Sequence, residues 1–287
     1  MTTTHHTRHQ GSSSAPERSL VCEPVVRTAL RLSWAVTALM VAGALWGLLG
    51  RGVYHETTWG RAAFRGGDLV SLVVVAPLLV WSLTRVRTGS RVAALLWAGA
   101  LVYNVYNYAY FVFGASFNDL FGLHILVLTA SAWSLVLMLP ALHASMRPGT
   151  GLTGVPARRV AVLLGSVAVC LGGIWGAAIA RQAVTGHLLG GAAPPAGQHT
   201  VFAVDLTFFV SSLVVTSVVL WRRTRWGAVA GTALTVGGST YLLNLVAAQA
   251  FQARAGVDVA AVSPLSLALV AAFGWAAVAM VRSTRLL

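Results

Sequence analysis

The sequence predicts an all-α membrane protein, a polytopic helical bundle of about eight transmembrane helices built as two parallel four-helix repeats. Three observations favour this class. Of the 287 residues, 57% are hydrophobic and only 9% are charged, whereas soluble domains carry roughly 25% charged residues. The apolar residues come in runs of about 20, the length of helix that crosses a bilayer core of roughly 30 Å. Arginines separate these runs, as topology signals do in membrane proteins.

The spans are expected at residues 28–50, 67–84, 92–114, 119–141, 159–181, 201–221, 226–250 and 261–282. With both chain ends inside, 15 arginines lie on the inner side and 5 on the outer side. The positive-inside rule therefore predicts that both termini are cytoplasmic, with anionic lipids near the inner arginines. Heavy use of Ala, Gly, Val and Arg without lysine suggests a GC-rich bacterial genome, and hence a bacterial inner membrane.

The chain is expected to divide into a disordered cytoplasmic tail (1–24), a first four-helix repeat (25–145) and a second repeat (146–287). Four matches occur in the same order in both halves, and the second and third share an offset of 137 residues. The matched elements are the glycine–tryptophan–glycine segments 43–47 and 172–176, Asp68 with Asp205, Asn107 with Asn244, and Trp133 with Trp275. Because each repeat has four spans, both halves enter the membrane in the same direction, which predicts a pseudo-twofold axis along the membrane normal.

Glycines four residues apart line one face of a helix in both segments. Gly43 with Gly47, and Gly172 with Gly176, have this spacing. Small residues in such a pattern let two helix backbones approach closely in lipid. We expect these faces to pack at the interface between the repeats.

Composition also excludes several function classes. The net charge of +13 does not indicate nucleic-acid binding, because the arginines lie at helix ends and in short loops. The chain has no lysine, which excludes a retinal Schiff base, a phosphate-loop lysine and pyridoxal chemistry. His124 is the only histidine inside a span, so a haem held between two helices is not expected. The outer-loop histidines fit no ligand signature, and we expect neither a metal nor a cofactor.

Polar residues inside the spans are the candidate site. Asp68 and Asp205 lie near the outer side, and Asn107 and Asn244 lie at comparable depth on the following helices. An asparagine amide can donate to a carboxylate, so each half is expected to form an Asp–Asn pair. The pairs are interpreted either as structural clamps between helices or as a site for a substrate or a proton.

The third span carries an unusual polar stripe. Tyr103, Tyr106, Asn107 and Tyr110 follow the spacing i, i+3, i+4 and i+7, which places them on one helical face. The stripe either lines a cavity that binds a polar or cationic group or forms an interfacial aromatic belt. Because the second half has Thr240 in place of Tyr103, a site would be dominated by the first half.

The stretch Tyr106-Asn107-Tyr108, followed by Phe-Gly-Ala-Ser-Phe-Asn-Asp-Leu-Phe at 113–121, resembles a pattern in uncharacterised bacterial multi-spanning membrane proteins. The resemblance implies the architecture and no activity. The favoured hypothesis is small-molecule transport or binding through an outward-facing polar site made by Asp68, Tyr103, Tyr106, Asn107, Asp205 and Asn244. A membrane-embedded enzyme that uses an aspartate on a lipophilic substrate, and a non-catalytic membrane subunit, are the alternatives.

Overall fold

The structure is a computed structural model that describes residues 23–146, 157–187 and 194–285. The predicted tail at 1–24 lies almost wholly outside these residues. The described chain is helical, and two of its long helices contain a π-helical segment. The elements are α1 (Pro24–Leu49), α2 (Thr58–Val70), a π-helical segment (Ser71–Val75), α3 (Ala76–Val86), α4 (Arg91–Phe113), α5 (Phe121–Ser145), α6 (Ala157–Thr185), α7 (Pro195–Val204), a second π-helical segment (Asp205–Val210), α8 (Ser211–Trp221), α9 (Arg225–Arg254) and α10 (Pro264–Arg285).

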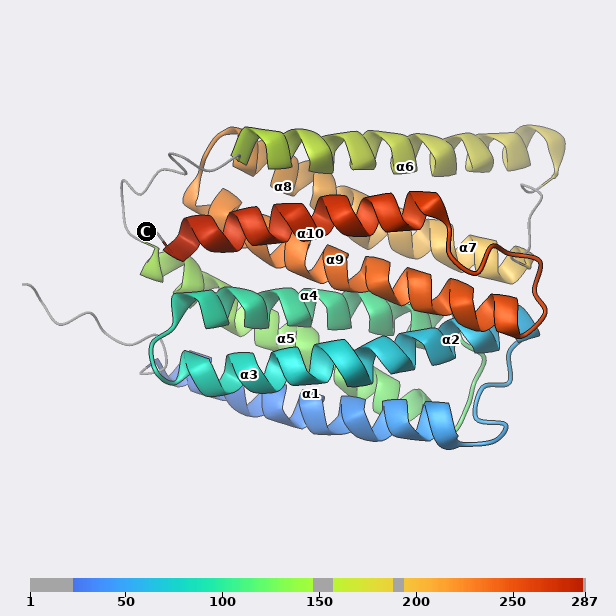
Figure 1. Cartoon of the computed structure of the whole chain (residues 1–287), viewed down its shortest axis with the longest axis horizontal. Helices are drawn as coiled ribbons and strands as arrows, with labels where there is room; N and C mark the ends of the chain where they lie inside the picture. Colours follow the sequence, from blue (N-terminus) through green and yellow to red (C-terminus); the bar gives the residue numbers. More distant parts are fainter. Residues whose placement is uncertain (1–22, 147–156, 188–193, 286–287) are drawn as a thin grey trace, which may run out of the picture.

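The predicted all-α polytopic bundle is confirmed. Within the described residues, 7 helices are long and apolar enough to cross a membrane, and α2 with α3, like α7 with α8, forms one continuous helix. The 23-residue α4 is long enough but is not among them, because its tyrosines and asparagines lower its hydropathy. It lies among the other helices in the bundle (Figure 1). The number of spans and the division into repeats stay predictions.

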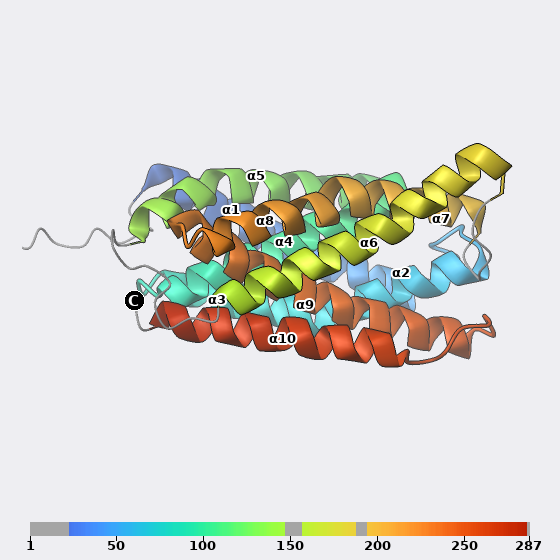
Figure 2. The same cartoon turned by 90° about the horizontal axis from the view of Figure 1, so that it is seen from above.

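The helices lie side by side along the long axis of the molecule (Figure 1). The first residues of α1 and the last residues of α10 are at the same end of the bundle. An apolar stretch of α9 is 67% buried, whereas an equally long apolar stretch of α6 is only 17% buried. The helix α6 runs obliquely along the flank formed with α8 (Figure 2), so it presents most of its surface to the surroundings.

Buried apolar side chains form two clusters that broadly follow the two halves of the sequence. The first is built mainly from α1 to α5 and includes Val229 and Ala233 of α9. The second is built mainly from α6 to α10 and includes Tyr106 and Ala109 of α4. The helices α4 and α9 therefore contribute to both clusters, and their contact joins the two halves.

Side-chain caps explain where several helices begin. Thr57, Ser90 and Thr224 each accept a hydrogen bond from the backbone N–H three residues later. Such caps satisfy a donor that has no partner within the helix. The cap at Thr57 starts the second long helix nine residues before the predicted position 67. This extra length carries Arg61 and Arg65 at one end of the bundle.

Candidate functional site

Two buried aspartates mark the polar interior of the bundle. Asp68 is 2% exposed and Asp205 is 7% exposed. A π-helical segment begins three residues after Asp68, at Ser71–Val75, and the other begins at Asp205 itself. A π-helical turn holds an extra residue and is frequent at functional sites. Pro77, which lacks an N–H for the helical ladder, explains the first segment, whereas the second, Asp205–Val210, has no such proline.

Aromatic side chains from two other helices hold the Asp205 carboxylate. The phenols of Tyr106 and Tyr110, both on α4, donate to Oδ1. Trp175 of α6 donates from Nε1 to Oδ2 over 2.9 Å. Within the described residues, no arginine forms an ion pair with this carboxylate. Asp205 is therefore a potential anion that hydrogen bonds stabilise but no cation neutralises.

The rings around Asp205 pack against one another. The Tyr106 and Tyr241 centroids lie 4.4 Å apart at an interplanar angle of 70°. Tyr110 stacks on Tyr241 at 5.9 Å, and Phe209 stacks on Tyr106 at 5.2 Å. We call Tyr106, Tyr110, Trp175, Phe209 and Tyr241 the Asp205 cluster. Its members come from α4, α6, the second π-helical segment and α9, so any movement of these helices changes the surroundings of the carboxylate.

The surroundings of Asp68 are different. Tyr54, in the loop before α2, donates its phenol hydrogen to Oδ2 of Asp68 over 2.7 Å. Burial, reinforced by the Asp68 carboxylate, raises the pKa of Tyr54 above its usual range, so the phenol keeps its proton and remains a donor. Gly47 of α1 lies directly against both side chains, and a Cβ at this position would clash with Asp68. The site around Asp68 is consequently closely packed.

The predicted pairs of Asp68 with Asn107 and of Asp205 with Asn244 are wrong. Instead, Asn244 donates from Nδ2 to Oδ1 of Asn107 over 2.7 Å, which joins α9 to α4. Gly67 explains the difference, because a Cβ on it would lie 3.3 Å from Oδ1 of Asn244 and 3.5 Å from Oδ1 of Asn107. On α2 it is thus Gly67 that faces the two amides, while Asp68 contacts Tyr54.

The contact between the two amides leaves hydrogen-bonding capacity unused. Nδ2 of Asn107 and Oδ1 of Asn244 are buried and have no partner in the described structure. Both polar atoms of Asn104, one turn earlier on α4, are also buried without a partner. Unpaired polar groups in a buried setting cost about 1–3 kcal/mol each. These amide atoms are therefore candidates for contacting a ligand or an ordered water.

The tyrosine stripe of α4 lies in the interior, so the interfacial-belt interpretation fails for it. Tyr103 and Tyr106 are buried, and so is Tyr108 on the same helix. Tyr103 shares a hydrogen bond with Ser71 of the first π-helical segment, at 3.1 Å between hydroxyl oxygens. Tyr106 and Tyr110 instead contact Asp205. The helix α4 therefore supplies tyrosines to polar contacts in both halves, and a site dominated by the first half stays a prediction.

The glycine faces differ between the halves. Gly43 packs against Leu123 of α5, and Gly47 packs against Asp68, both within the first half. A Cβ on Gly172 would reach only Val210, at 3.3 Å, and one on Gly176 would meet nothing within 4 Å. The expected packing at an interface between repeats is wrong on both sides. In the second half the glycine face of α6 has almost no close neighbour, and Trp175 between the two glycines contacts Asp205.

The matching tryptophans also have different environments. Trp175 donates to Asp205, whereas Trp46 of α1 is 56% exposed. Trp133 and Trp275 are both exposed, which suits side chains that face lipid. The residues that match in the sequence therefore do not make corresponding contacts.

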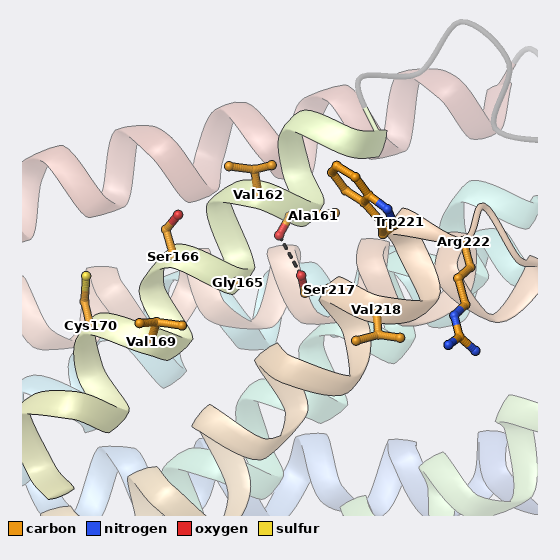
Figure 3. Close-up of a pocket in the computed structure, with 10 residues that line it drawn as sticks. All are labelled: Ala161, Val162, Gly165, Ser166, Val169, Cys170, Ser217, Val218, Trp221 and Arg222. Atoms are coloured by element: carbon orange, nitrogen blue, oxygen red, sulfur yellow. Dashed lines mark hydrogen bonds between the residues drawn. The ribbon is translucent and has the colours of Figure 1, made fainter.

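A lateral groove of about 670 Å³ runs between α6 and α8. Figure 3 shows its lining, which includes Ser166, Cys170, Trp221 and Arg222. Ser217 does not point a free hydroxyl into the groove, because it donates to the carbonyl of Ala161 over 2.8 Å. No carboxylate and no histidine line the groove. Its surface is mostly apolar, as expected for a groove that lipid chains fill.

Sequence reasoning assigned Trp175 to helix packing and did not place Tyr54 or Tyr241 in the site. Tyr110 belonged to the predicted stripe, which was the one sequence signal for the residues around Asp205. Among the described residues, no group of three or more His, Cys, Asp or Glu residues could hold a metal ion.

Comparison with protein-family models, with curated proteins and with solved structures finds no match for this chain, so its functional interpretation rests on its own residues.

Proposed function

We propose that the protein binds a small molecule with a cationic group, such as an amine, and carries it across a membrane, with Asp205 as the counter-ion. The observation that supports this most is a buried carboxylate among aromatic rings that has no arginine partner in the described part of the chain. Ring faces attract cations by about 0.5–2 kcal/mol, more when water is excluded. Ionisable residues inside a membrane are functional candidates by default.

Tyr110 supplies the entry to this site. It is partly exposed, unlike Tyr106, and both phenols donate to the same oxygen of Asp205. An ammonium group that replaces the Tyr110 phenol would leave Tyr106 and Trp175 to hold the carboxylate in place. Binding neutralises the charge of Asp205 and of the ligand together, which lowers the cost of moving the ligand through the low-dielectric interior.

The amides of Asn107 and Asn244 supply a second point of recognition. One donor and one acceptor remain unused there, on the same two helices that carry Tyr106 and Tyr241. A ligand with a polar group beside its cation would pair with them. We propose that Asp68, which bonds to Tyr54, and Tyr103, which bonds to Ser71, belong to the same outward-facing site. The enzyme acting on a lipophilic substrate is disfavoured because the lateral groove has no carboxylate.

Amines should stabilise the protein through Asp205. We expect choline or benzylamine to raise the melting temperature of the purified protein in detergent, and benzyl alcohol, the neutral counterpart of benzylamine, to have no such effect. A ligand at 100 times its dissociation constant contributes about 2.7 kcal/mol. Asp205→Asn should abolish the shift, whereas Asp119→Asn, which changes an exposed carboxylate, should retain it. A panel of amines that stabilises wild type and Asp205→Asn equally would refute the proposal.

We propose further that both termini face the cytoplasm of a bacterial cell. The bias of arginines toward one side supports this orientation. The start of α1 and the end of α10 also lie at the same end of the bundle (Figure 1). In a variant without Cys22 and Cys170, a cysteine at the exposed Thr185 should react with a membrane-impermeant thiol reagent in intact cells. A cysteine at the exposed Thr88 should not react. The opposite pattern would invert the orientation.

A further inference from the structure

A second, basic pocket lies between α2 and α9. It has a volume of about 280 Å³, and three arginines line it: Arg61, Arg65 and Arg254. Thr58 and Phe251 contribute to its wall. The ends of α2 and α9 that carry these residues are at the same end of the bundle (Figure 1). The pocket is smaller than the roughly 300–1,000 Å³ typical of drug-sized ligands, so it suits a single small group.

The positive charge in this pocket is not paired at close range by the described residues, although Asp68 interacts with Arg65 over a longer distance. Within the described residues, no carboxylate forms an ion pair with any of the three arginines. Arg65 donates from one terminal nitrogen to the carbonyl of Gly50 over 3.3 Å, and its Nε is buried without a partner. Asp68, one turn further along α2, bonds to Tyr54 instead. A half-buried guanidinium with an unused donor needs an acceptor that the described protein does not supply.

The walls of the pocket are held in place by contacts that do not involve the arginines. Gln252 of α9 donates from Nε2 to the carbonyl of Trp59 over 3.2 Å. Gly66 brings the two backbones together, since a Cβ there would lie 2.5 Å from the backbone nitrogen of Ala248. The guanidinium groups are consequently positioned in advance, which lowers the entropic cost of binding.

The position of these arginines is unusual for the topology that the sequence predicts. Only five arginines fall on the expected outer side, at positions 51, 61, 65, 181 and 254. Three of the five line this pocket. Arginines are not needed on that side as topology signals, so their clustering around one pocket favours a role in binding a ligand.

We propose that this pocket binds a phosphate group, carried either by an anionic lipid head group or by a free phosphate compound. The planar guanidinium donates two parallel hydrogen bonds to phosphate, and several arginines together favour phosphate over a single carboxylate. Arg61 and Arg254 are exposed, so their side chains are free to contact a phosphate that the half-buried Arg65 binds from the inner side of the pocket. The proposal does not depend on cation binding at Asp205.

Two probes distinguish the sources. For free phosphate, thermal stability of the delipidated protein is measured during titration with inorganic phosphate against chloride at equal ionic strength. For lipid, the protein is reconstituted in phosphatidylcholine bilayers with increasing phosphatidylglycerol, and bound phosphatidylglycerol is counted by native mass spectrometry. We expect Arg61→Gln and Arg254→Gln each to weaken the affinity for inorganic phosphate or for phosphatidylglycerol at least threefold. The double variant should weaken the same affinity at least tenfold.

Arg181→Gln is the matched control, because it removes the same charge from the expected outer side without lining the pocket. It should retain wild-type affinity in both experiments. A loss in the phosphate titration alone assigns a free phosphate compound, and a loss in the lipid experiment alone assigns a head group. Equal affinities for wild type and the double variant in both experiments would overturn the proposal. So would an equal loss in Arg181→Gln, which would show only general charge attraction.

Discussion

Gly66→Leu should prevent the protein from accumulating as a monodisperse species in detergent, or lower its stability by about 3 kcal/mol or more. A Cβ at Gly66 would lie 2.5 Å from the backbone nitrogen and 2.6 Å from the Cα of Ala248. Backbone atoms cannot rotate away as a side chain can, so α2 and α9 must separate. Overpacking of a well-packed interior typically costs 1–3 kcal/mol, and a clash with backbone costs more.

Gly173→Leu is the matched control for this prediction. Gly173 also lies within a long helix, α6, but a Cβ there meets nothing within 4 Å. Replacing an exposed helical glycine gains roughly 1 kcal/mol or less of helix propensity. In size-exclusion chromatography after heating, the monodisperse fraction should therefore be smaller than that of wild type for Gly66→Leu and equal or larger for Gly173→Leu. Equal profiles for Gly66→Leu and Gly173→Leu would show that the close contact of α2 with α9 is not needed for folding.

Asp205→Leu should produce the second largest loss, of about 2–5 kcal/mol. Two phenols and the Trp175 indole lose their acceptor together. Hydrogen bonds between membrane helices average about 0.6 kcal/mol and reach about 1.7, and the orphaned donors remain buried. Asp205→Asn should cost less, because its carbonyl oxygen still accepts a bond and its amide can donate to a phenol oxygen.

The check on this prediction is the melting temperature of both variants beside Asp119→Leu. Asp119 is exposed, so its replacement should leave the melting temperature unchanged. The expected order of stability places wild type first, Asp205→Asn next and Asp205→Leu last. A melting temperature for Asp205→Leu at or above that of wild type would contradict the hydrogen-bond network around Asp205.

The positions of the long helices could be predicted because lipid imposes a simple rule: a long apolar run satisfies its backbone hydrogen bonds within a helix. The second span was the exception. Its first turns carry Arg61, Arg65 and three glycines, so they lack the apolar signal, and they are helical because Thr57 caps them and α9 packs against them. The spacing of the stripe on α4 could be read from the sequence, since helical periodicity is a local property.

The partners of the polar residues could not be predicted in the same way. Asp68 and Asn107 correspond to Asp205 and Asn244 at one offset, which suggested a pair within each half. The observed bond joins residues 137 apart, Asn107 and Asn244, so the amides pair with each other across the halves. The contact of Trp175 with Asp205 depends on how far α6 lies from its neighbours, and no pattern within a single helix encodes that distance.

The central claim is that a cation binds beside Asp205, and Trp175 reports on this event directly. Its indole donates to the carboxylate, so an arriving amine should change its fluorescence emission. Titration with the amine that stabilises the protein best should give a saturable change in wild type. The same change should occur in Trp46→Phe, which alters the exposed tryptophan at the matching position, and should vanish in Trp175→Phe. An unchanged signal in Trp175→Phe, or no saturable change in wild type, would contradict the account.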